Sequence, residues 1–148
     1  MLIELKLKAI GIDETAGVPV IILENDKHDT IPIWVNVFEG SCLIKSIYNE
    51  KSSRPLTYDL IVKLLEIQKL ELKKVVITDI IDNVFYSLIV LKNNNNEIIE
   101  IDSRPSDSIN IATMLKKPIF IKEELIERIP INFKNKDYDI TEEDFKEI

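Results

Sequence analysis

The stretch EIIEIDSRPSDSINIA, residues 97–112, passes from a strand pattern to a helix pattern within a few residues. Residues 97–102 are rich in isoleucine and typical of a strand, whereas an apolar, helix-like run follows Pro105. Proline is favoured at the first position of a helix because its missing N–H would have no partner there. The sequence therefore predicts that a strand ends and a helix begins at Ser103-Arg104-Pro105.

The segments on either side of this junction extend the pattern to the whole chain. Further strands are predicted at 2–10, 18–24, 31–36, 74–81, 84–92 and 118–121, and further helices at 38–50, after Pro55 and at 123–129. The helix after Pro55 is expected to have an apolar stripe of Leu60, Ile61, Leu64 and Leu65. This order predicts the α+β class: a single domain with a mostly antiparallel or mixed sheet and three main helices, roll-like in shape. Residues 1–130 form that domain, and 131–148 are expected to be a charged C-terminal extension packed on or beside it.

Composition bounds the class of protein. The chain has 148 residues, 45% of them hydrophobic, which suits one domain with an ordinary core. No apolar run approaches the roughly 18 residues of a membrane span, and the N-terminus alternates apolar and charged residues where a signal peptide would be continuously apolar. We therefore expect a cytoplasmic protein without a membrane partner. Its single cysteine, Cys42, is expected in the core.

The net charge of −7 bears on the choice of partner. The chain has 26 acidic residues against 19 basic ones. Nonspecific nucleic-acid binding relies on clustered Lys and Arg that release counterions. Any contact with nucleic acid is therefore expected to be weak and transient.

The tripeptide Ser-Arg-Pro occurs twice, at residues 53–55 and 103–105, each time ahead of an apolar run. A helix N-terminus with an adjacent arginine favours an anion such as phosphate. The same residues are also what an ordinary helix start prefers, with each arginine paired to a nearby acid. Both interpretations predict that Arg54 and Arg104 lie at helix N-termini within reach of a carboxylate or an anion.

Two blocks of sequence around these tripeptides resemble a known family. Arg54-Pro55-Leu56-Thr57 runs on to Asp59-Leu60, and Asp102 is followed by Arg104-Pro105-Ser106-Asp107. Together with Ile31-Pro32-Ile33-Trp34-Val35 and Lys117-Pro118-Ile119-Phe120-Ile121, they are similar to the bifunctional nuclease domain. The resemblance covers most of residues 1 to 130, and it implies hydrolysis of phosphodiester bonds in DNA or RNA.

The resemblance also implies a set of site residues. Glu39 and Asp107 are its candidate catalytic residues, and Arg54, Thr57, Arg104 and Ser106 its candidates for binding substrate. Glu39, Asp102 and Asp107 are the candidate ligands of Mg²⁺ or Mn²⁺, because each lies within a matching block and carboxylate oxygens suit these cations. A surface acid at a helix start is the alternative interpretation of Glu39.

One departure from the family pattern concerns the chemistry. Family members commonly have histidine between the Thr and Asp of the first block, where this chain has Tyr58. Tyrosine is a poor base at neutral pH because its ordinary pKa is about 10. The one histidine, His28, lies in a predicted polar turn. A histidine-based mechanism is therefore not expected, and hydrolysis would have to use carboxylates and metal.

The alternative function is a noncatalytic module that binds a small anion, a nucleotide or a protein partner through the two Ser-Arg-Pro helix starts. The many Ile and Leu residues, including Ile12, Ile21 and Leu23, lead us to expect self-association as a homodimer.

Overall fold

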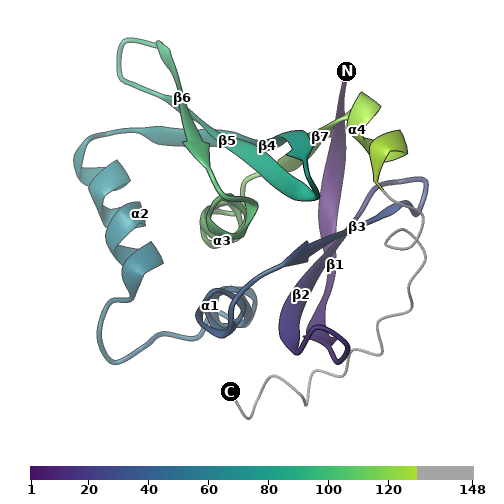
Figure 1. The fold of residues 1–148 in the computed structure, drawn as a ribbon. Helices are drawn as coiled ribbons and strands as arrows, with labels where there is room; N and C mark the ends of the chain where they lie inside the picture. The colour runs from purple at the N-terminus through teal and green to yellow at the C-terminus, as the bar shows by residue number, and fades with distance from the viewer. Residues whose placement is uncertain (130–148) are drawn as a thin grey trace.

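The computed structural model describes residues 1–129 of the chain. It has seven strands and four helices in this range (Figure 1). In chain order they are β1 Leu2–Asp13, β2 Val18–Glu24, β3 Thr30–Trp34, α1 Val37–Ile47, α2 Thr57–Ile67, β4 Glu71–Ile81, β5 Val84–Lys92, β6 Ile98–Ser103, α3 Pro105–Leu115, β7 Ile119–Lys122 and α4 Glu123–Arg128. The predicted α+β class is confirmed, and each predicted strand and helix is present with its ends moved by a few residues.

All seven strands belong to one sheet, in the order β3-β2-β1-β7-β4-β5-β6. Neighbours are antiparallel except β4 and β7, which are parallel. Short hairpin connections account for the antiparallel pairs of consecutive strands, whereas β7 reaches its place between β1 and β4 by the longer connection through α3. The sheet is therefore mixed, as predicted.

Helices α1 and α3 pack on each other and lie between the two ends of the sheet (Figure 1). The core is aliphatic, and its fully buried members come from both halves of the sheet and from α1 and α3; they include Ile21, Leu23, Ile31, Leu43, Leu91, Ile109 and Ile121. Because α3 is covered on several sides, most of its residues are buried. This burial fixes the position of the α3 N-terminus. The second Ser-Arg-Pro tripeptide lies there, between the end of β6 and the start of α3.

Helix α2 is more exposed than the sequence suggested. Of its expected apolar stripe, Ile61 and Leu65 pack against the core, whereas Leu60 and Leu64 are exposed. Figure 1 shows α2 set to one side of α1 and α3. Half of the apolar stripe is therefore exposed, because no element covers the outer face of α2 within residues 1–129.

No helix in residues 1–129 combines the length and apolar character that a membrane span needs. The predicted C-terminal extension, 131–148, lies outside the described residues.

Candidate functional site

Arg104 is the N-cap residue of α3, with extended backbone, and Pro105 is the first helical residue. Its guanidinium group reaches forward to Asp107, one turn into the helix. Nε donates to Oδ2 at 2.9 Å and Nη2 donates to Oδ1 at 3.0 Å. This two-point pairing fixes the guanidinium plane better than a single contact would.

Glu39 reaches the same guanidinium from α1. Its backbone N–H donates to Asn36 Oδ1 at 2.8 Å, and its Oε2 accepts from the Asn36 N–H at 2.9 Å. This capping box holds the carboxylate at the start of α1. The other oxygen, Oε1, lies 2.9 Å from Arg104 Nη2, within ion-pair distance, although the angles there are not those of a hydrogen bond. The side chain of Glu39 is only 5% exposed, so this is a buried charge with one cationic neighbour.

Tyr58 completes the cluster from α2. Its hydroxyl donates to Asp107 Oδ1 at 2.7 Å, and its ring stacks on Phe38 with centroids 6.2 Å apart. Burial and, next, the hydrogen bond to the Asp107 carboxylate raise the pKa of Tyr58 well above its ordinary value. Tyr58 therefore stays a protonated donor at neutral pH.

We call Glu39, Tyr58, Arg104 and Asp107 the Arg104 cluster. Three helices supply it, and it joins residues that are up to 68 positions apart in the chain. Two carboxylates share one guanidinium, so the cluster is acidic by one charge when Tyr58 is neutral. Such a site can polarise or deprotonate a water molecule, and it can present an arginine to a phosphate group.

Asn110 ties the cluster together from one turn further along α3. Its Nδ2 donates to the backbone oxygen of Glu39 at 3.2 Å and to that of Ser106 at 2.9 Å. Asn110 is fully buried, and its Oδ1 has no hydrogen-bond partner among the described residues. The side chain therefore locks α1 to α3 while leaving one buried oxygen unsatisfied.

The hydroxyl groups of Ser87, Ser103 and Ser108 lie next to the connection between β6 and α3 that carries Arg104. Ser87 Oγ on β5 donates to the Ser103 carbonyl at 2.8 Å and lies 3.0 Å from the hydroxyls of Ser103 and Ser108. Ser87 and Ser108 are fully buried. These contacts hold the end of β6 and the start of α3 together on either side of Arg104.

The other predicted site residues lie elsewhere. Arg54 is exposed, three residues before α2 begins, and it has no ion pair within residues 1–129, so the carboxylate partner expected for this arginine is absent there. Thr57 is exposed at the start of α2, and Asp102 is exposed on β6. Ser106 is buried, with its carbonyl bonded to Asn110.

The predicted metal ligands do not gather as a group of three. In residues 1–129, no set of three or more His, Cys, Asp or Glu side chains is arranged to hold a metal ion. Glu39 and Asp107 each form an ion pair with Arg104. Mg²⁺ is often held by one or two carboxylates together with substrate phosphates, so these two oxygen donors fit a cation that arrives with its substrate.

Tyr58, Asn110 and Ser87 were missed by sequence reasoning as parts of the site. Tyr58 was noted only as a replacement for histidine. Asn110 and Ser87 have ordinary helix and strand neighbours, and nothing in their local pattern marks them. Only the packing of α1 and β5 against α3 brings them to the cluster.

Comparisons with known proteins identify the family of this chain. The family model described as the bifunctional nuclease domain matches residues 20–134. An uncharacterized protein of Mycobacterium tuberculosis is 30% identical over 124 residues, covering 83% of this chain and 73% of its own length.

Plant relatives carry the family's name. Bifunctional nuclease 2 of Oryza sativa subsp. japonica is 31% identical over 119 residues, and bifunctional nuclease 1 of Arabidopsis thaliana is 28% identical over 111 residues. The matches cover 78% and 72% of this chain but 37% and 34% of the plant proteins. All four residues of the Arg104 cluster lie within the matched range of the family model, and the chain is a member of the bifunctional nuclease domain family.

Proposed function

We propose that this chain is a nuclease that hydrolyses phosphodiester bonds of DNA or RNA at the Arg104 cluster. The observation that supports this most is the meeting of Glu39 and Asp107 on one arginine at a helix N-terminus. Membership of the family and the names of the plant relatives point the same way at the level of the family.

The residues have distinct roles in this proposal. Arg104, 67% exposed at its side chain, binds a non-bridging phosphate oxygen and stabilises the charge that develops there. Asp107, only partly buried, is the group best placed to accept a proton from the attacking water. Tyr58 fixes the orientation of the Asp107 carboxylate, and the buried Glu39 fixes Arg104.

A divalent cation, Mg²⁺ or Mn²⁺, is part of the proposal. Glu39 and Asp107 would hold it, and Asn110 Oδ1 is a further buried oxygen with no hydrogen-bond partner in residues 1–129. The ion would supply a Lewis acid for the phosphate. Arg104 already pairs with both carboxylates, so cation binding and the Arg104 ion pairs are expected to compete.

The test compares variants on one labelled oligonucleotide. Cleavage of single-stranded DNA, duplex DNA and RNA is followed with Mn²⁺, with Mg²⁺ and with a chelator, for the parent and for Glu39→Gln, Asp107→Asn and Arg104→Ala. The matched control is Arg54→Ala, which removes the other Ser-Arg-Pro arginine. We expect the chelator and the three cluster variants to abolish cleavage and the control to leave it unchanged.

Identical preparation of all variants guards against a contaminating nuclease. If the three cluster variants cleave as fast as the parent, the site is wrong. If no protein cleaves any substrate, the noncatalytic binding module becomes the better account.

We also propose that the protein acts as a homodimer in the cytoplasm. The outer face of α2 presents Leu60, Leu64 and Ile67, each more than half exposed. A second copy covering this face would remove apolar surface from water. Light scattering of the parent and of Leu64→Asp tests this, since a parent that is monomeric at micromolar concentration would exclude the dimer.

A further inference from the structure

Phe38 is an exposed aromatic residue beside the Arg104 cluster. It directly precedes Glu39 in the first turn of α1, and it is 44% exposed. Val37, the residue before it, is 47% exposed. The roles proposed above for the four residues of the Arg104 cluster give neither of these apolar side chains a part. The start of α1 therefore presents apolar surface directly next to a proposed phosphodiester site.

Tyr58 covers only part of the Phe38 ring. The two ring centroids are 6.2 Å apart and the ring planes are 16° from parallel, which is the geometry of an offset stack. Tyr58 is 4% exposed, so it is the inner ring of the pair and Phe38 is the outer one. The stack therefore leaves Phe38 with accessible ring surface, on which a further flat group can be placed.

The inner ring connects Phe38 to the acid of the proposed site. The Tyr58 hydroxyl donates to Asp107 Oδ1 at 2.7 Å, and Asp107 forms an ion pair with Arg104. Only a ring stack and a hydrogen bond thus separate Phe38 from the carboxylate proposed to accept a proton. The Arg104 side chain is 67% exposed, so both the guanidinium group and the Phe38 ring can be reached from solvent.

The charge of the chain favours an aromatic contact with nucleic acid over a basic groove. The net charge is −7, so the chain has little capacity to gain affinity by releasing counterions from a strand. An aromatic ring binds a base without a cluster of cations, because each base has a flat face on which it can stack.

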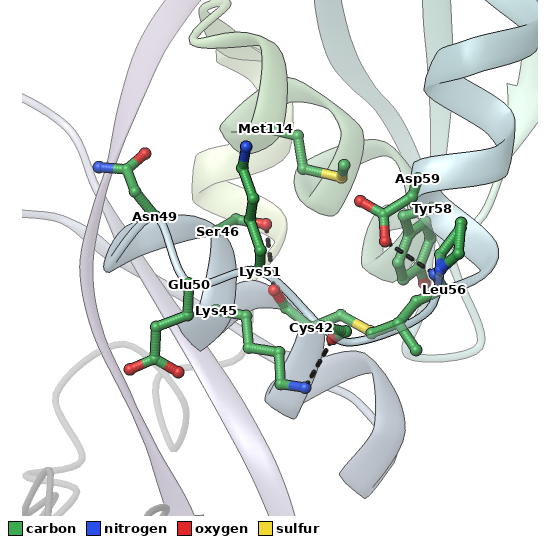
Figure 2. A pocket seen from close by; sticks show the side chains of 12 residues that line it. Cys42, Lys45, Ser46, Asn49, Glu50, Lys51, Leu56, Tyr58, Asp59 and Met114 are labelled. Carbon is green, nitrogen blue, oxygen red and sulfur yellow. Dashed lines mark hydrogen bonds between the residues drawn. The ribbon is translucent and has the colours of Figure 1, made fainter.

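A cavity of about 420 Å³ beside Tyr58 does not offer a ring and a phosphate site together (Figure 2). Phe38 and Arg104 are not among its lining residues. Its two lysines, Lys45 and Lys51, point to opposite sides in Figure 2, and two acids line it as well. The cavity therefore has no single position for a phosphate, and a substrate strand is better placed over Phe38.

We propose that Phe38 stacks on a base of the substrate strand, through the ring surface that Tyr58 leaves open, while a neighbouring phosphodiester lies at Arg104. The inference rests on the proposed function, because it makes Phe38 a substrate-binding residue for that cleavage. It assigns single-stranded nucleic acid as the substrate class, since a base on Phe38 cannot remain paired and stacked in a duplex.

The first test combines a protein variant with a missing base. Single-stranded oligonucleotides of uniform sequence carry one abasic position each, and the rate of cleavage at every bond is read from the product lengths. In the parent, we expect bonds at one fixed distance from the abasic position to be cut about tenfold more slowly, the size of one base–aromatic stack.

Phe38→Leu keeps an apolar side chain against Tyr58 but has no flat ring. We expect this variant to cut all bonds about tenfold more slowly than the parent, with no further loss near the abasic position. If Phe38 acted only by holding Tyr58 in place, the loss near the abasic position would persist in Phe38→Leu. That persistence would overturn the proposal.

Tyr86→Leu is the matched control. Tyr86 is a 40% exposed aromatic residue on β5, and no contact between it and the Arg104 cluster is recorded within residues 1–129. The variant should keep both the rates and the abasic pattern of the parent. Phe38→Trp, which retains a flat ring, should also keep the abasic pattern. Cleavage of a duplex as fast as of the single strand would contradict the assigned substrate class.

The second test measures binding without cleavage, by fluorescence anisotropy in the presence of a chelator. The probes are a single-stranded oligonucleotide and a strand of the same length in which every position is abasic. The parent should bind the first about tenfold more tightly, whereas Phe38→Leu should bind the two equally. Equal affinities in the parent would overturn the stacking contact.

The outcomes separate this inference from the proposed function. Cleavage without any effect of the abasic position removes the stacking contact and leaves the nuclease. Affinity that depends on bases and on Phe38, in the absence of cleavage under any condition, removes the nuclease and leaves the stacking contact. Loss of both results overturns the two proposals together.

Discussion

The two Ser-Arg-Pro tripeptides have the same sequence and different structures. At the second, Arg104 caps α3 and pairs with two carboxylates. At the first, Arg54 is exposed in the connection before α2 and has no ion pair within residues 1–129. The tripeptide therefore marks a nearby helix start but does not determine what its arginine does.

The residues that follow account for the difference. Asp107 is three residues after Arg104, the spacing at which side chains on a helix meet, whereas Asp59 is five residues after Arg54. Helix α2 also begins later, at Thr57, and Asp59 is used to cap Leu56. Arg54 is thus too far from the N-terminus of α2 to pair with Asp59.

The largest expected effect is on catalysis, when each arginine is removed in turn. Arg104→Ala should lower kcat/KM for a single-stranded oligonucleotide by about 10²-fold or more, because it removes the donor for the phosphate charge. Arg54→Ala should change kcat/KM by less than about twofold, since surface substitutions away from a site are nearly neutral. Initial rates on the same substrate measure both.

An equal loss of kcat/KM in the two variants would contradict the distinction between the two Ser-Arg-Pro tripeptides. Arg104→Lys refines the comparison, because lysine keeps the charge but cannot pair with Asp107 at two points. We expect it to recover only part of the activity.

The next largest effect is expected at Asp107, the acid that follows the second Ser-Arg-Pro tripeptide. Asp107→Asn keeps the size of the side chain but removes the charge that Arg104 and Tyr58 both contact. Activity should fall by about 10²-fold, the lower range for loss of a general base. A rate that is restored at high pH in this variant would assign the proton transfer to another group.

A smaller effect is expected from Tyr58→Phe, on stability. The variant loses the hydrogen bond to Asp107, at a cost of about 1 kcal/mol near neutral pH. The raised pKa of Tyr58 means that the native state keeps a proton that the unfolded chain loses near pH 10. The contribution of Tyr58 is therefore complete below about pH 10 and declines as pH rises above it.

Urea unfolding of the parent and Tyr58→Phe at pH 8, 10 and 11 checks the sign. The difference between their free energies of unfolding should shrink with rising pH. A difference that grows instead would mean that the phenol is not held in its neutral form.

The fold could be predicted from sequence because its elements have local signals. Pro105 marks the start of α3, and the alternation in residues 2–10 marks β1. The burial of each face has no such local signal, because the apolar residues Leu60 and Leu64 of α2 are exposed while Ile61 and Leu65 beside them are packed.

The candidate site could be predicted only in part. Arg104, Asp107 and Glu39 were found through the sequence blocks, whereas their partners Tyr58 and Asn110 depend on how three helices meet. The carboxylate partner expected for Arg54 is absent because equal tripeptides do not have equal structures. Distances between helices, which no local pattern encodes, decide which acid an arginine reaches.

The smallest effect is expected at Asp59, the acid that follows the first Ser-Arg-Pro tripeptide. Asp59→Asn weakens the hydrogen bond from the Leu56 N–H, at 2.8 Å, and removes a negative charge from the start of α2. Because the bond is exposed, the loss should be about 0.5 kcal/mol or less. Activity should remain that of the parent, since Asp59 does not contact the Arg104 cluster through any hydrogen bond or ion pair recorded within residues 1–129. Thermal unfolding and kcat/KM of this variant are measured beside those of Asp107→Asn. A large loss of activity in Asp59→Asn would mean that the region of the first Ser-Arg-Pro tripeptide takes part in catalysis.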